Sequence, residues 1–295
     1  MNAGLSLSGR TRLTAIFGDP VEHSLSPAMH NRAYATLGMD RAYVAFRVAP
    51  ADLPAAVRAI PPLGILGVNL TVPHKEAAVA LMDTLSAEAQ LLGAINCVVN
   101  RDGRLHGDNT DARGLEQDLR EAGLDLAGKR ALIIGAGGAA ASAILAVIRL
   151  GAEAIALCNR TLGRAQELAR RFEHYVGDAR RATRLEVAGL QALTIPATWA
   201  SCALVINATS LGLGGDPFPP LAYEATPSDC CFYDLIYARA PTPFLAPALA
   251  MGRVARDGAG MLANQGALAF ELFNGIAPPR GLMRATLMAA LGRST

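Results

Sequence analysis

The chain has 295 residues, about twice the ~150 residues of a typical domain, so we expect two domains. Its 27 basic and 25 acidic residues give a net charge of +2, and 5% of its residues are aromatic, which argues against nucleic acid as a partner. The five cysteines include no C-x-x-C pair, so neither a disulfide framework nor a zinc ribbon is indicated. Residues 1–13 hold no apolar signal segment, and the apolar stretch 136–148 is too short to span a bilayer. We therefore expect a cytoplasmic protein that does not bind a membrane.

The first third of the chain alternates between short apolar runs and helical patterns. This alternation predicts an α/β domain with a largely parallel sheet and crossover helices. The predicted strands are 13–17, 43–48 and 65–70, and the predicted helices are 27–37 and 51–60. A further apolar strand is expected at 94–99, and a helix is expected from Asp111 to Ala122.

A second α/β run begins at Lys129 and has the βαβ pattern of a nucleotide-binding domain. Its predicted strands are 130–134, 154–158, 203–206 and 231–234, and its predicted helices are 138–150 and 162–172. Residues 260–291 are predicted to form two helices, broken at Pro278 and Pro279, that fold back onto the first domain.

A glycine-rich turn joins the first strand and helix of this second run. It reads Gly135-Ala136-Gly137-Gly138-Ala139-Ala140 and matches G-x-G-x-x-G/A in the required strand-to-helix context. Small residues here permit a tight turn and let a pyrophosphate approach the helix N-terminus. The alternative is a glycine-rich turn with no ligand.

The choice of dinucleotide depends on the end of the next strand, where an acidic residue would bind the ribose hydroxyls of NAD. The sequence there is Asn159-Arg160-Thr161, with Arg164 one helical turn further on. Two guanidinium groups and a hydroxyl suit a 2′-phosphate, which favours NADP over NAD. Simple surface exposure of both arginines is the alternative.

Lys75 is unusual because the chain contains only two lysines, Lys75 and Lys129, beside 25 arginines. Of the two basic residue types, only lysine can transfer a proton, since guanidinium does not lose its proton in proteins. Pro73 suits the first position of a helix, and an ammonium group in a first helical turn opposes the helix dipole, which favours release of its proton. We interpret Lys75 as a catalytic acid or base and Lys129 as surface charge. Chance survival of both lysines is the alternative.

Five other polar residues are candidates for ligand binding. Ser24 and Ser26 lie at the mouth of a βα turn, although Ser26 would also serve as a helix N-cap. Asp111 is either a first-turn acid or the charge partner of Lys75. Asn96 interrupts an apolar strand and Gln265 lies on an apolar helix face, so both amides need partners. The five histidines show no metal-binding spacing, and we expect no metal.

Together these segments resemble the shikimate dehydrogenase family over nearly the whole chain. The matching stretches are FGDPVEHSLSP (17–27), NLTVPHK (69–75), GAIN (93–96), GDNTD (107–111), the glycine turn, NRT (159–161), NATS (207–210), YDLIY (233–237) and GML (260–262).

The resemblance implies reduction of 3-dehydroshikimate to shikimate by NADPH, in the route to chorismate and the aromatic amino acids. It implies that Lys75 and Asp111 form the catalytic pair. It implies substrate contacts from Ser24, Ser26, Thr71, Asn96, Tyr237 and Gln265, and nicotinamide contacts from Thr209, Leu235, Gly258 and Met261. The implied fold is a substrate domain (1–110 and 259–295) with an inserted Rossmann-type NADP domain (111–258).

Two rival functions remain open from the sequence. One is a relative that also accepts quinate and uses NAD, against which Arg160 and the paired Ser24 and Ser26 argue. The other is a non-catalytic NADP-binding regulatory homologue, against which the retention of Lys75 and Asp111 argues. Both a monomer and a homodimer are compatible with the sequence.

Overall fold

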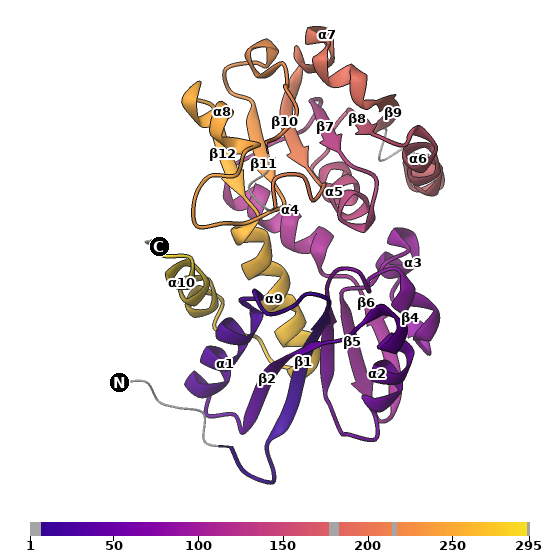
Figure 1. Cartoon of the computed structure of the whole chain (residues 1–295), viewed down its shortest axis with the longest axis vertical. Coiled ribbons are helices and arrows are strands. Elements are labelled where there is room, and N and C mark those ends of the chain that lie inside the picture. The colour runs from indigo at the N-terminus through magenta and orange to yellow at the C-terminus, as the bar shows by residue number, and fades with distance from the viewer. Residues whose placement is uncertain (1–6, 177–182, 214–216, 294–295) are drawn as a thin grey trace. The chain divides into compact units, whose positions relative to one another are not determined.

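The computed structural model describes residues 7–176, 183–213 and 217–293. The chain divides into two compact units, which we describe separately. Unit 1 is Met1–Gly114 with Leu262–Thr295, and unit 2 is the segment Leu115–Met261 between them. Figure 1 follows the chain by colour from one terminus to the other.

Within the described residues, unit 1 contains a six-stranded sheet in the order β2-β1-β3-β5-β6-β4. The strands are β1 (Arg12–Gly18), β2 (Arg41–Arg47), β3 (Gly67–Leu70), β4 (Thr84–Leu85), β5 (Cys97–Arg101) and β6 (Arg104–Asp108). The pairings of β1 with β2, β1 with β3, and β4 with β6 are parallel. The mostly parallel sheet predicted for this unit is confirmed.

An antiparallel hairpin interrupts the parallel order, because β5 runs against both β3 and β6. The amino end of β5 therefore lies at the same edge of the sheet as the carboxyl ends of β1, β3 and β6. The predicted strand 94–99 is displaced, since β5 begins at Cys97 and Asn96 precedes it instead of interrupting it. Residues 104–108, with the polar sequence RLHGD, had no strand signal.

Helices of unit 1 cover the sheet and bury its apolar side chains. They are α1 (Ser26–Thr36), η1 (Pro50–Asp52), α2 (Leu53–Ala59), η2 (Ala77–Leu81), α3 (Ala87–Leu92) and α10 (Arg280–Ala290), with parts of α4 (Asp111–Glu121) and α9 (Ala259–Asn274). Phe17, Val68, Leu70, Ile95 and Val98 belong to one buried cluster under β1, β3 and β5. The C-terminal helix α10 lies beside α1, so the predicted return of the tail to the first domain is confirmed (Figure 1).

Over the described part of the chain, unit 2 contains a six-stranded sheet in the order β12-β11-β10-β7-β8-β9, with every pairing parallel. The strands are β7 (Arg130–Ile134), β8 (Ala154–Asn159), β9 (Arg184–Gly189), β10 (Cys202–Asn207), β11 (Cys231–Asp234) and β12 (Val254–Asp257). The helices are α5 (Gly138–Arg149), α6 (Leu162–Val176), η3 (Leu190–Thr194), α7 (Pro196–Trp199), η4 (Tyr223–Ala225) and α8 (Leu245–Ala250). This is the predicted Rossmann-type domain.

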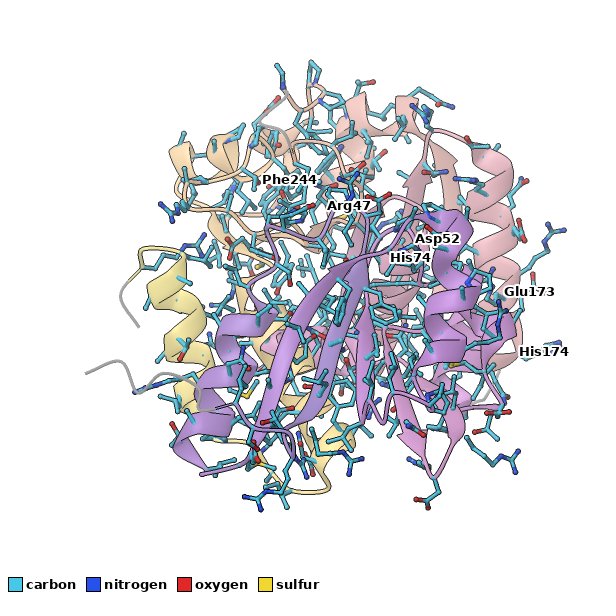
Figure 2. The ribbon with its side chains drawn as sticks, turned by 60° about the horizontal axis from the view of Figure 1, so that its bottom comes forward. Arg47, Asp52, His74, Glu173, His174 and Phe244 are labelled. Carbon is cyan, nitrogen blue, oxygen red and sulfur yellow. The ribbon has the colours of Figure 1, made fainter. Side chains whose placement is uncertain are left out.

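The core of unit 2 holds a cluster of aromatic rings on one side of its sheet. The ring centroids of Tyr223 and Phe232 are 5.1 Å apart, as are those of Phe218 and Phe244, and Trp199 is fully buried with them. Phe244 is labelled in Figure 2.

The described helices include none that is both long enough and apolar enough to cross a bilayer.

Candidate active site

Four polar segments of unit 1 meet at one edge of its sheet, where β1, β3 and β6 end and β5 begins. Ser24 follows β1, Lys75 follows β3, Asn96 precedes β5 and Asp111 follows β6. Backbone bonds hold these ends together, since Leu70 N donates to Asn96 O at 2.9 Å and Asn96 N donates to Asp108 O at 3.1 Å. Ligands of parallel sheets bind at the carboxyl ends of strands, so this edge is the candidate substrate site.

Lys75 and Asp111 form an ion pair at this edge. Lys75 Nζ donates to Asp111 Oδ2 at 2.6 Å, and the two side chains are 25% and 7% exposed. The Lys75 carbonyl accepts from Ile95 N at 2.9 Å, which anchors the backbone beside Asn96. The ammonium group is therefore held next to a buried carboxylate and still reaches solvent.

The predicted helix start at Lys75 is wrong. Residues 72–76 form turns, and the next element is the short η2, which begins at Ala77. Pro73 therefore does not occupy a first helical position, and the helix-dipole argument for Lys75 does not apply. The neighbours of Lys75 come from the turn before β5 and from the first residue of α4.

His74 anchors this turn to the segment after β2. Its ring Nε2 donates to the backbone carbonyl of Val48 at 2.8 Å, and the residue is 1% exposed. Val48 follows β2, and Figure 2 labels His74 together with Arg47, the last residue of that strand. The turn that carries Lys75 is thus tied to the end of β2, which is distant from it in the sequence.

Asn96 and Gln265 lie in one polar network with Asp111. Asn96 Nδ2 donates to Asp111 Oδ1 at 2.7 Å and lies 3.3 Å from Gln265 Oε1. Thr110, which was not predicted, donates from its backbone N to Asn96 Oδ1 at 2.8 Å and from its hydroxyl to Gln265 Oε1 at 3.4 Å. Asn96 and Thr110 are nearly fully buried. The predicted amides therefore have partners within unit 1, and Gln265 comes from α9.

Ser24, Ser26 and Thr71 lie near the same edge. Ser26 N donates to Ser24 Oγ at 3.4 Å, and Thr71 N donates to the Phe17 carbonyl at 3.0 Å. The alternative role of Ser26 as an N-cap is wrong, because Leu25 holds that position and α1 begins at Ser26 without a side-chain cap. Ser26 is also 4% exposed.

Tyr43 and Asn69 form a buried link that sequence reasoning missed. Tyr43 OH donates to Asn69 Oδ1 at 2.9 Å, and Asn69 Nδ2 donates to the Asn96 carbonyl at 3.0 Å. Burial raises the pKa of Tyr43 well above its ordinary value, so it stays a neutral phenol. Asn69 lies in a motif matched to the family. Tyr43 lies in an apolar strand, and no sequence pattern indicated a role for it.

The second polar region is the carboxyl edge of the sheet in unit 2, which forms a pocket of about 340 Å³. The predicted residues that line it are Gly135, Ala136, Gly137, Asn159, Arg160, Arg164 and Thr209, and the residues not predicted are Leu190, Ala208, Ser210 and Leu211. Gly138 and Ala139 begin α5, and Thr161 accepts from Asn159 Nδ2 at 2.9 Å.

The glycine turn has the geometry that a pyrophosphate site requires. Gly135 has φ of +120°, and a Cβ there would lie 2.8 Å from the Ala208 carbonyl oxygen, so only glycine fits. A Cβ on Gly137 would meet nothing within 4 Å, so its backbone faces open space. Gly137 is also the N-cap of α5 and offers no side-chain cap, which leaves the first N–H groups of α5 for an anion. These residues fit a dinucleotide.

Arg160 and Arg164 supply the positive charge of this pocket. Both are exposed, and neither forms an ion pair with another described residue. Among the described residues that line the pocket, none is Asp or Glu. The pocket therefore suits a 2′-phosphate better than a free 2′-hydroxyl.

Thr209 is held by a buried network that the sequence analysis did not assign. Thr209 Oγ1 donates to Asn207 Oδ1 at 2.7 Å, and Asn207 Nδ2 donates to Asp234 Oδ1 at 2.9 Å. Thr242 Oγ1 donates to the other oxygen of Asp234 at 2.5 Å. Burial raises the pKa of Asp234 to about 6, partly offset by the bonds from Thr242, Ile236 and Asn207. Asn207 ends β10 and Asp234 ends the neighbouring strand β11. Both residues lie in motifs matched to the family, and these motifs could have indicated the network.

The remaining predicted residues also belong to unit 2. A Cβ on Gly258 would lie 2.3 Å from the Leu235 carbonyl, so these two residues pack together where β11 and β12 end. Met261 is 9% exposed near the start of α9. Tyr237 follows β11, and burial raises its pKa. Tyr237 was predicted to bind substrate, but it lies in unit 2, whereas the Lys75 cluster lies in unit 1.

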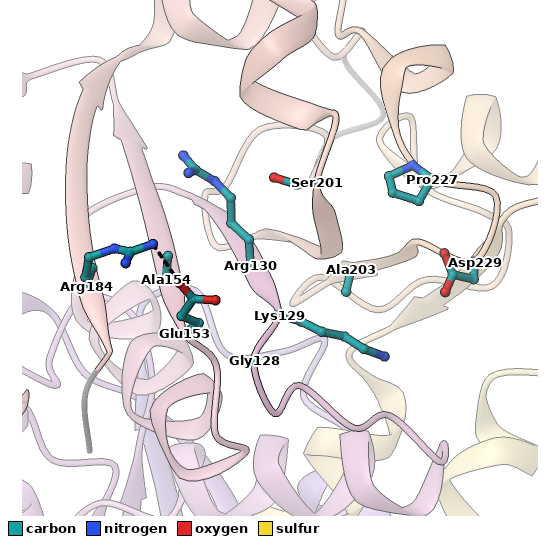
Figure 3. A pocket seen from close by; sticks show the side chains of 10 residues that line it. All are labelled: Gly128, Lys129, Arg130, Glu153, Ala154, Arg184, Ser201, Ala203, Pro227 and Asp229. Carbon is teal, nitrogen blue, oxygen red and sulfur yellow. Dashed lines mark hydrogen bonds and ion pairs between the residues drawn. The ribbon is translucent and has the colours of Figure 1, made fainter. Parts of the chain in front are cut away.

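Another hollow of unit 2, also about 340 Å³, is lined at the amino ends of its strands (Figure 3). Its arginines are paired, since Arg184 Nη2 lies 2.9 Å from Glu153 Oε1 and Arg130 Nη2 lies 2.6 Å from Glu186 Oε2. Because ligands of parallel sheets bind at the carboxyl ends, the dinucleotide pocket is the one at the glycine turn. Among the described residues, His, Cys, Asp and Glu side chains nowhere form a group of three or more that could hold a metal ion.

Comparison with known proteins assigns the chain to a family. Residues 16–98 match the shikimate dehydrogenase substrate-binding domain, residues 117–208 match shikimate/quinate 5-dehydrogenase, and residues 258–288 match the shikimate 5′-dehydrogenase C-terminal domain. The chain belongs to the shikimate dehydrogenase family.

Individual relatives cover nearly the whole chain. Shikimate dehydrogenase (NADP+) of Geobacter sulfurreducens is 42% identical over 97% of this chain and 99% of its own length. A shikimate dehydrogenase crystallised with NADP+ superposes with a TM-score of 0.88 at 32% identity, covering 98% of this chain and 99% of that one. The Thermus thermophilus enzyme with NADP(H) and shikimate gives 0.82 at 38% identity, covering 95% and 100%. The resemblance inferred from the motifs is confirmed.

Proposed function

We propose that this chain catalyses the reversible, NADPH-dependent reduction of 3-dehydroshikimate to shikimate. The observation that carries the proposal is the Lys75–Asp111 ion pair of 2.6 Å, held at a ligand-binding sheet edge in a member of this family. Relatives named shikimate dehydrogenase (NADP+) cover nearly the full chain, which supports the choice of substrate and cofactor.

Lys75 is the proton donor in this proposal. Its Nζ delivers a proton to the carbonyl oxygen as that oxygen becomes a hydroxyl, and it takes the proton back in the reverse direction. Asp111 orients the ammonium group and compensates its charge, and Asn96 Nδ2 fixes Asp111 through the bond of 2.7 Å. The general acid is therefore positioned before the substrate binds.

The other polar residues recognise the substrate. Ser24 and Ser26 bind its carboxylate, and its ring hydroxyls are bound by Thr71, Asn96, Gln265 and Tyr237. Buried hydroxyls and amides discriminate well between substrates, because a ligand that lacks a matching group leaves them unpaired. We assign substrate binding to residues 1–110 with 259–295, together with Tyr237, and cofactor binding to residues 111–258, together with Met261.

The glycine turn and the neighbouring arginines are the proposed NADP site. Backbone N–H groups at Gly137 to Ala139 would hold the pyrophosphate, and Arg160 with Arg164 would bind the 2′-phosphate. Thr209, Leu235, Gly258 and Met261 would contact the nicotinamide side. The chemistry that NADPH supplies when bound is a hydride.

Initial rates with purified full-length protein test this function. Shikimate and quinate are each combined with NADP+ and NAD+, and we expect the highest kcat/KM for shikimate with NADP+. A higher kcat/KM for quinate with NAD+ would identify the relaxed quinate enzyme instead. No turnover of either substrate, with NADP+ still raising the thermal midpoint, would identify a non-catalytic NADP-binding homologue. The cytoplasmic location and the monomeric or dimeric state stay predictions.

A further inference from the structure

Arg113 is a charged residue near the Lys75–Asp111 pair that neither the motifs nor the proposed mechanism uses. It lies two residues after Asp111 on α4, and its side chain is 33% exposed. Its Nη2 donates to Asp108 Oδ2 at 2.7 Å and to the Asn109 carbonyl at 3.0 Å. Its Nε lies 3.7 Å from Glu88 Oε1 on α3. One guanidinium group thus joins α4 to the turn that precedes it.

That turn sets the position of Asp111. Asn109 Oδ1 accepts from Asp111 N at 3.0 Å, and Asn109 Nδ2 donates to the Ala94 carbonyl at 2.9 Å. The Asp108 carboxylate accepts from Ser86 Oγ at 2.6 Å and from Asn109 N at 2.8 Å. Displacement of Asp108 or Asn109 would therefore move the backbone from which the Asp111 carboxylate extends.

The charge of Arg113 is needed because Asp108 is almost completely buried, with 6% of its surface exposed. Burial alone would raise the pKa of Asp108, but the hydrogen bond from Ser86 and the charge of Arg113 outweigh it, and the net pKa is lowered. A buried carboxylate that loses its cation either takes up a proton or moves toward water. Either response disturbs the bonds that Asp108 makes to the turn.

We propose that Arg113 is a positioning residue that holds Asp111 against Lys75 by clamping the Asp108–Asn109 turn. Its hydrogen bonds are to Asp108 and Asn109 and its ion-pair contact is with Glu88, so it acts through the turn and not on Lys75 directly. The part that concerns turnover rests on the proposed function, but the structural part does not. The two parts can therefore be tested separately.

The scarcity of lysine makes a test without catalysis possible. The chain has only Lys75 and Lys129, so full-length protein labelled with 13Cε-lysine gives two lysine resonances, assigned with the Lys75→Arg variant. In Arg113→Met we expect the chemical shift of the Lys75 resonance to change, while the Lys129 resonance stays in place. An unchanged Lys75 resonance overturns the proposal, whether or not the protein turns over shikimate.

Kinetics test the consequence for the reaction. We expect kcat of Arg113→Met to fall about 10- to 100-fold, because catalytic groups displaced by about 1 Å lose activity on this scale, while KM for NADP+ stays within about twofold. The acid limb of the kcat profile should move to higher pH, since Asp108 without its cation binds a proton more readily. Adding Asp108→Asn should remove that pH shift and cause no further loss of kcat.

Arg120→Met is the matched control, because Arg120 lies on the same helix and pairs with Glu116 at 2.9 Å. If Arg113→Met and Arg120→Met have equal kcat values and equal pH profiles, the proposal is wrong. If Arg113→Met does not fold, Arg113→Lys replaces it, because lysine keeps the charge but has one nitrogen, whereas Arg113 bonds Asp108 and Asn109 through Nη2 and faces Glu88 through Nε. Wild-type values in both the lysine spectrum and kcat for that variant overturn the proposal equally.

Discussion

Replacing Lys75 by Arg separates the charge of this residue from its ability to give up a proton. The guanidinium group keeps the positive charge beside Asp111, whose side chain is 7% exposed, and can still bond to its carboxylate. It cannot donate its proton to the substrate, because it does not deprotonate in proteins. We therefore expect Lys75→Arg to fold with nearly wild-type stability and to lose turnover.

The structure sets the size of both effects. A positioned general acid contributes about 10²- to 10⁴-fold, so kcat should fall about 1,000-fold, which corresponds to about 4 kcal/mol of the barrier. The free energy of unfolding should change by less than about 1 kcal/mol, since the ion pair is replaced and Lys75 is partly solvated. Lys75→Met, in contrast, leaves the Asp111 carboxylate without a cation and should cost about 1–3 kcal/mol of stability.

The assay follows NADPH absorbance during shikimate oxidation and pairs each rate with a urea unfolding curve. Lys129→Arg is the control, because Lys129 is exposed and lies in unit 2, and its kcat should equal that of the wild type. A Lys75→Arg enzyme that keeps more than about a tenth of the wild-type kcat would refute the assignment of Lys75 as proton donor.

Three further predictions concern unit 2. Gly135→Ala should lower the thermal midpoint and raise KM for NADP+ at least about tenfold, because φ is +120° and the new Cβ would lie 2.8 Å from Ala208 O. Arg160→Ser should raise KM for NADP+ about 10- to 100-fold, through loss of a charge-assisted bond, and leave KM for NAD+ within about twofold. Ionisation of the buried Asp234 should lower the free energy of unfolding of the wild type as the pH rises, and Asp234→Asn should remove this pH dependence. The pKa of Asp234 is about 6 in the fold against 3.8 in its ordinary state, so the wild type should lose about 2 kcal/mol relative to the variant between pH 4 and pH 7.

Each of these has its own control and contrary result. Gly137→Ala, at an open position, should fold as the wild type does, and equal thermal midpoints for the two glycine variants would contradict the steric argument. An equal rise of both KM values in Arg160→Ser would mean that Arg160 does not read the 2′-phosphate. A constant difference in unfolding free energy between wild type and Asp234→Asn across pH 4 to 7 would contradict the raised pKa.

Local patterns determined the elements of the nucleotide-binding domain well where strands are buried on both faces. The predicted strand at 130–134 matches β7, and the predicted strand at 231–234 matches β11, because central parallel strands read as continuous apolar runs. The edge strands β9 and β12 were missed, since their residues are partly exposed and lack such a run. The glycine turn was recognisable because its backbone requirement is local.

The chemistry of the site was only partly legible from the sequence. The rarity of lysine singled out Lys75, and the motifs named Asp111, but the local pattern placed Lys75 wrongly at a helix start. Only the tertiary structure decided its environment, because the antiparallel β5 brings Asn96 to the edge where β3 and β6 end. Arg113 had no signal at all, since an arginine in solvent and an arginine paired with a buried carboxylate look alike in sequence. The sequence by itself determines residue types and local turns. The hydrogen-bond partners and the burial of a side chain depend on segments that are distant in the sequence and come together only in the tertiary structure.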